Sequence, residues 1–225
     1  MSGVVVYMDW QNLYKRARSS FYTPDDPDFV HGQVWPHKLA RLLVDDHNSQ
    51  NGTSLQLQEI RIYRGKPGNK FDPTGYNAFQ RQVTAWRSHN NLIRVIYRDL
   101  KYPTRLNADG EWTRSDEPVK EKGVDVALAV DVATMSTEGI YAHAIVFSSD
   151  NDLAPAIEYV HANADPENGR PTVSVAAWDG GSRLRPRARN VYCRWVMEEE
   201  FKNVEDLRDY TIPTSTQSGP KPGPR

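Results

Sequence analysis

A short apolar segment near the start of the chain most constrains how the chain can fold. Gly3–Asn12 reads G-V-V-V-Y-M-D-W-Q-N, a valine-rich run that ends in a carboxylate, with an asparagine three residues later. Such a run is typical of a strand buried on both faces, as in a parallel sheet covered by helices. Ligands of open α/β sheets bind just beyond the carboxyl ends of the strands. Asp9 is therefore the first candidate for a functional residue.

Further apolar runs alternate with segments of helical periodicity along most of the chain. This alternation implies βαβ units, and it predicts an α/β fold: a three-layer α/β/α sandwich with a mostly parallel central sheet. A helix that is apolar nearly all round, Gly123–Ser136, is expected to be buried against this sheet. The predicted strands are Gly3–Met8, Leu55–Tyr63, Leu92–Tyr97, His143–Phe147, Thr172–Ala177 and Val191–Val196.

The length of 225 residues suits one domain with a sizeable core. We expect this domain to span residues 1–210, with a polar excursion over residues 99–121. Ala108–Glu111 contains Asp-Gly and predicts the tip of a hairpin in that excursion. Thr211–Arg225 has the composition of a disordered tail.

Composition and missing motifs exclude several classes of protein. The net charge of −1 indicates no general affinity for nucleic acid, so a local basic surface would have to provide it. The single cysteine, Cys193, excludes an intramolecular disulfide and a zinc site built from cysteines. The sequence shows no P-loop, no G-x-G-x-x-G, no signal peptide and no run long enough to cross a bilayer. We therefore predict a cytoplasmic protein without a membrane partner.

Four more aspartates are placed to join Asp9. Asp150 ends the predicted fourth strand and Asp152 opens the following helix, while Asp125 and Asp131 lie in the apolar helix before that strand. Three of the five have a simpler interpretation: Asp9 as a turn or cap, Asp152 as a helix N-cap, and Asp131 as a polar residue facing solvent. Asn12 is either a turn residue or a residue that orients Asp9, and Ser149 either caps a helix or holds a ligand.

Carboxylates gathered at one sheet edge repel each other, and a divalent cation relieves that repulsion. Oxygen-only ligands favour Mg²⁺ or Mn²⁺ over zinc or copper. Such a metal activates a water molecule and stabilises charge on a phosphoryl oxygen.

Three segments together resemble the NYN domain family of PIN-like ribonucleases, in the branch related to LabA and DUF88 proteins. They are M-D-W-Q-N at Met8–Asn12, K-E-K-G-V-D-V-A-L-A-V-D at Lys120–Asp131, and S-S-D-N-D-L-A-P at Ser148–Pro155. The first departs from the family pattern, because Trp10 stands where the family usually has glycine. The resemblance runs from about Gly3 to Ala177 and implies a PIN-like, Rossmann-like sheet.

The resemblance implies metal-dependent hydrolysis of RNA phosphodiester bonds, with products that carry a 5′-phosphate and a 3′-hydroxyl. It assigns Asp9, Asp125 and Asp150 to metal binding and Asp152 to a frequent fourth acid. Asn12, Ser149 and Asp131 match supporting polar positions.

A basic segment suits the nucleic acid. Ser182–Arg194 carries no acid, and alternate arginines on an extended segment point the same way, as phosphate contacts require. Exposed Trp10, Trp112 or Tyr102 would be able to stack bases. The predicted nucleic-acid-binding residues are Arg183, Arg185, Arg187, Arg189, Arg64 and Lys66. The competing interpretation pairs these arginines with surface acids such as Glu198–Glu200.

The leading hypothesis is thus a ribonuclease that uses Mg²⁺ or Mn²⁺ and acts on single-stranded RNA. One alternative is a non-catalytic relative that binds RNA or a protein, which Trp10 favours. Another is a metal-dependent phosphatase, which usually needs D-x-D after the first strand, whereas this chain has D-W-Q. The sequence leaves open single-stranded DNA as a substrate and a homodimer through an apolar sheet edge.

Overall fold

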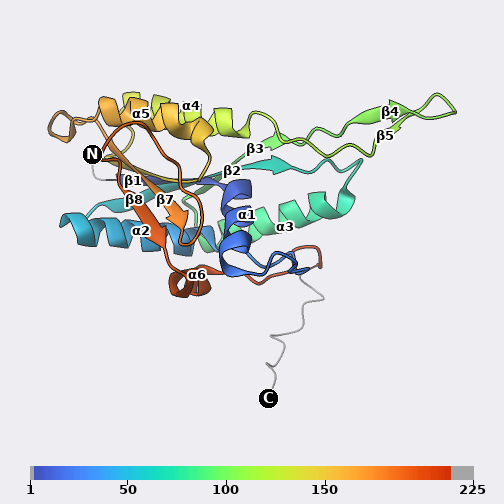
Figure 1. Ribbon diagram of the computed structural model, residues 1–225, viewed down its shortest axis with the longest axis horizontal. Helices are drawn as coiled ribbons and strands as arrows, with labels where there is room; N and C mark the ends of the chain where they lie inside the picture. Colours follow the sequence, from blue (N-terminus) through green and yellow to red (C-terminus); the bar gives the residue numbers. More distant parts are fainter. Residues whose placement is uncertain (1–2, 214–225) are drawn as a thin grey trace, which may run out of the picture.

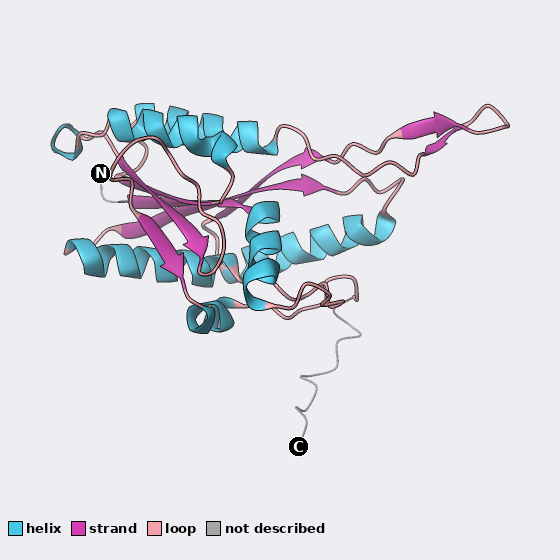
Figure 2. Cartoon of the chain, in the orientation of Figure 1, coloured by secondary structure: helices cyan, strands magenta, loops and turns pink. Residues whose placement is uncertain are grey.

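The computed structural model describes residues 3–213 and contains one six-stranded, fully parallel sheet (Figures 1 and 2). The strand order is β3-β2-β1-β6-β7-β8, with helices on both faces. The predicted three-layer α/β/α sandwich is therefore confirmed. The strands are β1 (Gly3–Asp9), β2 (Gln56–Lys66), β3 (Ile93–Asp99), β6 (His143–Phe147), β7 (Thr172–Trp178) and β8 (Cys193–Val196).

Strand β1 lies in the middle of the sheet and is buried along its whole length, as its valine-rich sequence predicts. Its side chains alternate between the two faces, so Val4, Val6 and Met8 join one core cluster. Val5 and Tyr7 join the cluster on the other face. Asp9 ends the strand, in register with Tyr63 of β2, which places its carboxylate at the carboxyl edge of the sheet.

The helices divide between these two clusters. One layer contains α1 (Trp10–Phe21), α2 (Pro36–Asn51), α3 (Pro73–His89) and the short α6 (Glu198–Val204). The opposite layer contains α4 (Val124–Thr137) and α5 (Ala154–Ala162), drawn at the top of Figure 1.

The predicted burial of the α4 helix is correct for only one side. Val124, Leu128 and Val132 are buried, whereas Val126 and Val130 are 65% and 51% exposed. An outer-layer helix has the sheet on one side and solvent on the other, so an apolar composition alone did not reveal the exposed face.

The polar excursion is a two-stranded antiparallel hairpin that extends away from the body of the domain (Figure 1). It comprises β4 (Thr104–Leu106) and β5 (Trp112–Arg114), with Asp-Gly in the turn. Of the predicted tail, only residues 211–213 are described, and Arg81 donates to the carbonyl of Thr211 (2.8 Å). The rest of that prediction lies outside the described residues. Within residues 3–213, no helix is both long and apolar enough to cross a membrane.

Gly123 allows α4 to begin just ahead of Asp125. It is the N-cap residue and has a left-handed φ of 75°, and an added Cβ would meet no atom within 4 Å. We expect Gly123→Ala to lower the free energy of unfolding by about 1 kcal/mol through backbone strain alone. Urea denaturation measures this loss, and Gly123→Asn should lose less because asparagine tolerates this conformation better. A Gly123→Ala protein as stable as the wild type would contradict the argument.

Candidate active site

Asp9 stands at the junction of β1 and α1, and its carboxylate is engaged on both oxygens. Oδ1 accepts the backbone N–H of Asn12 (3.2 Å) and so caps helix α1. Oδ2 accepts the hydroxyl of Ser148 (2.9 Å), which follows β6. The side chain is only 3% exposed, and burial raises the pKa of Asp9 to about 7 against the opposing effect of these hydrogen bonds. The cap interpretation is thus correct, and it places the carboxylate at the sheet edge.

A hydrogen-bonded network fastens the loop after β6 to the start of α1. The Oδ1 atom of Asn12 accepts from both the backbone N–H and the hydroxyl of Ser149 (3.0 and 2.9 Å). Arg16 donates in turn to the Ser149 hydroxyl (3.0 Å). The side chain of Asn12 therefore holds the Ser149 loop, while Asn12 orients Asp9 through its backbone.

Asp150 and Asp152 occupy the short 3₁₀ helix η1 (Asn151–Leu153) and its cap. The hydroxyl of Ser148 accepts from the backbone N–H of Asp150 (3.0 Å). Oδ1 of Asp150 accepts the backbone N–H of Asp152 (3.0 Å), so Asp150 is the N-cap. The prediction that Asp152 caps a helix is wrong, because the chain makes an extra 3₁₀ turn before α5. The Asp152 side chain is left exposed.

Asp125 adds a carboxylate from the first turn of α4. Burial raises its pKa, and the nearby charges of Asp150 and Asp152 raise it further. Within the described chain, Asp125 has neither a hydrogen bond from its side chain nor an ion pair. Asp125 thus lies within electrostatic reach of both Asp9 and Asp150.

Glu121 is an acid of this region to which we assigned no role from the sequence. Burial raises the pKa of Glu121, and the charge of Asp125 raises it further. The charge of Glu121 in turn raises the pKa of Asp9. The Glu121 carboxylate accepts the backbone N–H of Gly65 (2.5 Å). A Cβ on Gly65 would meet this carboxylate and the Leu100 side chain, so a larger residue would have to displace Glu121 from this position. The only sequence signal was its place in the K-E-K-G-V-D segment.

Asp131 lies apart from these acids in a structural ion pair. Its carboxylate accepts from the guanidinium of Arg61 and from the hydroxyl of Tyr63, both at 2.6 Å. Its side chain is 30% exposed, so the interpretation as a free solvent-facing residue is wrong. The pairing explains how an aspartate is tolerated in so apolar a helix.

The arginines of the basic segment Ser182–Arg194 are exposed at alternate positions, as their spacing predicts. Arg183, Arg185, Arg187 and Arg189 are all exposed, while the intervening Leu184 is buried. Within the described residues none of the four forms an ion pair with an acid. The competing interpretation applies to Arg194, which pairs with Glu200 and Asp46.

Two backbone contacts fix this arginine segment beside the acids. The N–H of Arg185 donates to the side chain of Asn151 (2.8 Å), which lies between Asp150 and Asp152. The N–H of Arg187 donates to Glu158 of α5 (2.5 Å). The exposed arginines therefore start directly next to η1.

The other predicted basic residues are not part of a free surface. Arg64 lies within β2, and its guanidinium is enclosed by the rings of Phe79, Trp10 and Trp86, at 4.7, 5.7 and 5.7 Å from their centroids. Lys66 pairs with Asp99 (3.2 Å). The predicted strand ended at Tyr63, whereas β2 continues to Lys66 and includes both residues.

The three aromatic residues predicted to stack on bases lie in different environments. Trp10 is 6% exposed and packs against Trp86, with ring centroids 4.4 Å apart, so it is not a surface residue. The phenol of Tyr102 accepts the N–H of Gly68 (3.0 Å). Trp112, on the hairpin, is 64% exposed.

Comparison with known proteins identifies the family. The profile of the NYN domain matches residues 3–165. The chain belongs to the NYN domain family. Membership places it in the PIN-like nuclease superfamily and agrees with the resemblance of its three acidic segments; the LabA/DUF88 branch stays a prediction.

Other comparisons add little. A crystal structure of a protein of unknown function from Vibrio parahaemolyticus is 15% identical, with a TM-score of 0.48, and the match covers 88% of this chain and 93% of that one. A search of curated proteins finds no match.

The family implies a divalent metal, and the side chains of this NYN domain can be checked for whether they suit one. Asp9, Asp125 and Asp150 offer only oxygen donors, and their mutual repulsion is what a divalent cation would relieve. Across residues 3–213, however, no three Asp, Glu, His or Cys side chains stand close enough together to enclose an ion. The residues therefore fit Mg²⁺ or Mn²⁺ in chemistry, and side-chain movement would have to complete the site.

The contrast between Asp131 and Asp125 gives a direct test of these assignments. Asp131→Asn should lower the free energy of unfolding by about 1–2 kcal/mol, because Arg61 and Tyr63 lose a charged acceptor that is only partly exposed. Asp125→Asn should cause no loss, because it removes a charge repelled by Asp150. Urea denaturation in metal-free buffer measures both variants. A larger loss for Asp125→Asn would reverse the two roles.

Proposed function

We propose that this NYN domain is a metal-dependent ribonuclease whose catalytic acids are Asp9, Asp125, Asp150 and Asp152. The observation that carries the proposal is the coupling of carboxylates from β1, α4 and the end of β6, which have no cation among the described residues to neutralise them. Asp9, Asp125 and Asp150 would hold Mg²⁺ or Mn²⁺. When bound, the metal would supply an activated water and stabilise charge on the phosphoryl oxygens.

The protein's own residues hold this arrangement in place. Ser148 bridges Asp9 and Asp150, and Asn12 with Ser149 fixes the loop between them. Asp131 acts on the same assembly from a distance, by securing α4 to β2. Water, in place of a ribose 2′-hydroxyl, would attack the phosphorus and break its bond to the 3′-oxygen, which gives products with a 5′-phosphate and a 3′-hydroxyl.

A non-catalytic RNA-binding module is the second candidate. It is favoured by one observation, that no three acids within residues 3–213 already enclose an ion site. Both candidates use the exposed arginine segment for phosphate contacts. Single-stranded RNA is the proposed partner in either case; a homodimer stays a prediction.

Cleavage of a labelled single-stranded RNA tests the catalytic proposal. We expect cleavage with Mn²⁺ or Mg²⁺ and none with EDTA. Asp125→Asn and Asp150→Asn should each lower the rate on the order of 100-fold, as the loss of a charge-stabilising group does. Asp109→Asn is the matched control, because this exposed aspartate lies in the hairpin turn.

The outcomes separate the candidates. Undiminished cleavage by Asp125→Asn and Asp150→Asn would rule out the assigned site. Absence of cleavage together with tight, salt-sensitive binding would establish the binding module. Hydrolysis of a small chromogenic phosphate ester, without RNA cleavage, would indicate a phosphatase.

The arginine segment gives a separate binding prediction. Arg185→Gln combined with Arg187→Gln should weaken binding of single-stranded RNA and reduce the slope of log K against log salt by about 0.7 for each phosphate that the protein no longer neutralises. Fluorescence anisotropy between low and moderate salt measures both effects. The matched control is Arg41→Gln with Arg87→Gln, exposed residues of α2 and α3 in the opposite layer. Equal weakening in the control would mean that phosphate binding is not localised to the arginine segment.

A further inference from the structure

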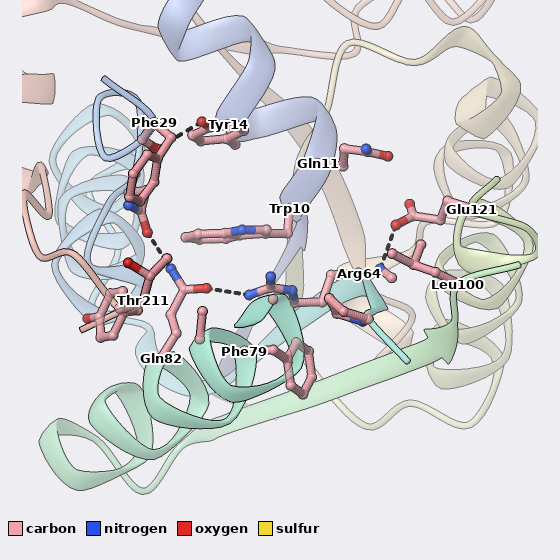
Figure 3. A pocket seen from close by; sticks show the side chains of 16 residues that line it. Trp10, Gln11, Tyr14, Phe29, Arg64, Phe79, Gln82, Leu100, Glu121 and Thr211 are labelled. Atoms are coloured by element: carbon pink, nitrogen blue, oxygen red, sulfur yellow. Dashed lines mark hydrogen bonds between the residues drawn. The ribbon is translucent and has the colours of Figure 1, made fainter. Parts of the chain in front are cut away.

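A cavity of about 320 Å³ opens beside the acidic residues, and neither the fold nor the proposed catalysis explains it (Figure 3). One of the residues that line it is Trp10, which follows Asp9 in sequence. Glu121, whose charge raises the pKa of Asp9, lines it as well. The cavity therefore lies next to the candidate active site, on its α3 side.

The walls of the cavity are largely aromatic. Trp10 extends across it in Figure 3, with Tyr14 and Phe29 above and Phe79 below. Phe29 stands at the rim, 49% exposed, and its carbonyl accepts the hydroxyl of Tyr14 (2.9 Å). Rings in this arrangement suit a flat ligand that stacks, as an unstacked nucleobase does.

Hydrogen-bonded side chains line the polar side of the cavity, and one of them is the guanidinium of Arg64. Arg64 donates through Nη1 to Gln82 (2.5 Å), and Gln82 donates to Gln33 (2.6 Å). Both glutamines are nearly buried. Each glutamine oxygen already accepts one hydrogen bond, whereas the guanidinium keeps a donor without any acceptor.

Arg64 is short of acceptors where it lies. It forms no ion pair with any described residue, its Nε atom is buried without a hydrogen-bond partner, and burial lowers its pKa to about 10. A buried guanidinium with unmet donors favours a ligand that presents acceptors. Glu121 and the neighbouring aspartates disfavour an anion, so a neutral ring with acceptor atoms suits the cavity better than a phosphate.

We propose that this cavity binds one unstacked guanine base of the RNA, with Arg64 directed at the O6 and N7 acceptors of guanine and the aromatic walls against its faces. An arginine fork matches this pair of acceptors, whereas adenine presents one acceptor and one donor there. The inference rests on RNA being the ligand in the proposed function. It makes Arg64 and the aromatic walls determinants of the sequence that is bound.

Binding without cleavage tests this inference separately from catalysis. The full chain carrying Asp125→Asn, in EDTA, is titrated with labelled oligouridine and with the same oligomer containing one guanosine, adenosine or cytidine. We expect the guanosine oligomer to bind roughly 10-fold more tightly than the others. Phe29→Ala and Arg64→Gln should each reduce that preference to about 2-fold or less, as expected when a stacking or bidentate interaction is removed.

Controls keep the result interpretable. Tyr159→Ala removes a comparably exposed aromatic side chain from α5 and should retain the preference. If circular dichroism shows that the Arg64→Gln protein does not fold, the Phe29→Ala protein alone tests the base preference, since Phe29 is at the surface.

Equal binding of all four oligomers, or a preference for another base, would overturn the inference even if the wild-type protein cleaves RNA. A guanosine preference in a protein that never cleaves RNA would support the cavity and reject the catalytic proposal.

Discussion

The hydrogen bond from Ser148 to Asp9 is the contact on which the carboxyl edge of the sheet depends. It joins residues 139 positions apart in sequence and ties the end of β1 to the end of β6. Ser148 also receives the N–H of Asp150, so one hydroxyl sets the relation between two of the acids. Because both Asp9 oxygens already accept hydrogen bonds, the carboxylate is held in one orientation despite its unfavourable burial.

The carboxyl edge of the sheet is bordered by a charged surface on one side and an aromatic cavity on the other. Toward α4 and η1 lie partly exposed acids and the exposed arginine segment, a surface suited to a charged backbone. Toward α3 lies the aromatic cavity with the enclosed guanidinium of Arg64. Trp10 connects the two, because it follows Asp9 directly and its indole packs against Trp86 of α3. The replacement of the usual family glycine by tryptophan is thereby accommodated within the core.

Local sequence determined more of the fold than of the site. The valine-rich run predicted a strand buried on both faces with Asp9 at its end, because such burial selects apolar residues at every position. The alternate spacing of the arginines likewise predicted a shared direction for phosphate contacts, and Arg183, Arg185, Arg187 and Arg189 are all exposed. These features depend only on neighbours along the chain.

Features that depend on distant partners were not predictable. Glu121 is positioned by Gly65, and Asp131 is neutralised by Arg61; each partner lies on β2, far away in sequence. The enclosure of Arg64 requires rings from α1 and α3 together. A basic residue in a Gly/Pro-rich stretch indicates a surface loop unless these contacts are known.

The central position of β1 also bears on how the protein is made. Strand β1 is synthesised before both of its neighbours in the sheet, β2 and β6, and β6 is completed only at Phe147. Domains generally fold as units as they leave the ribosome, and contacts between distant segments form late. Until β6 emerges, one side of β1 lacks its partner strand and Asp9 lacks Ser148 and Asp125. An unfinished chain therefore cannot assemble the acidic edge, and any activity of that edge is withheld until most of the domain has been synthesised.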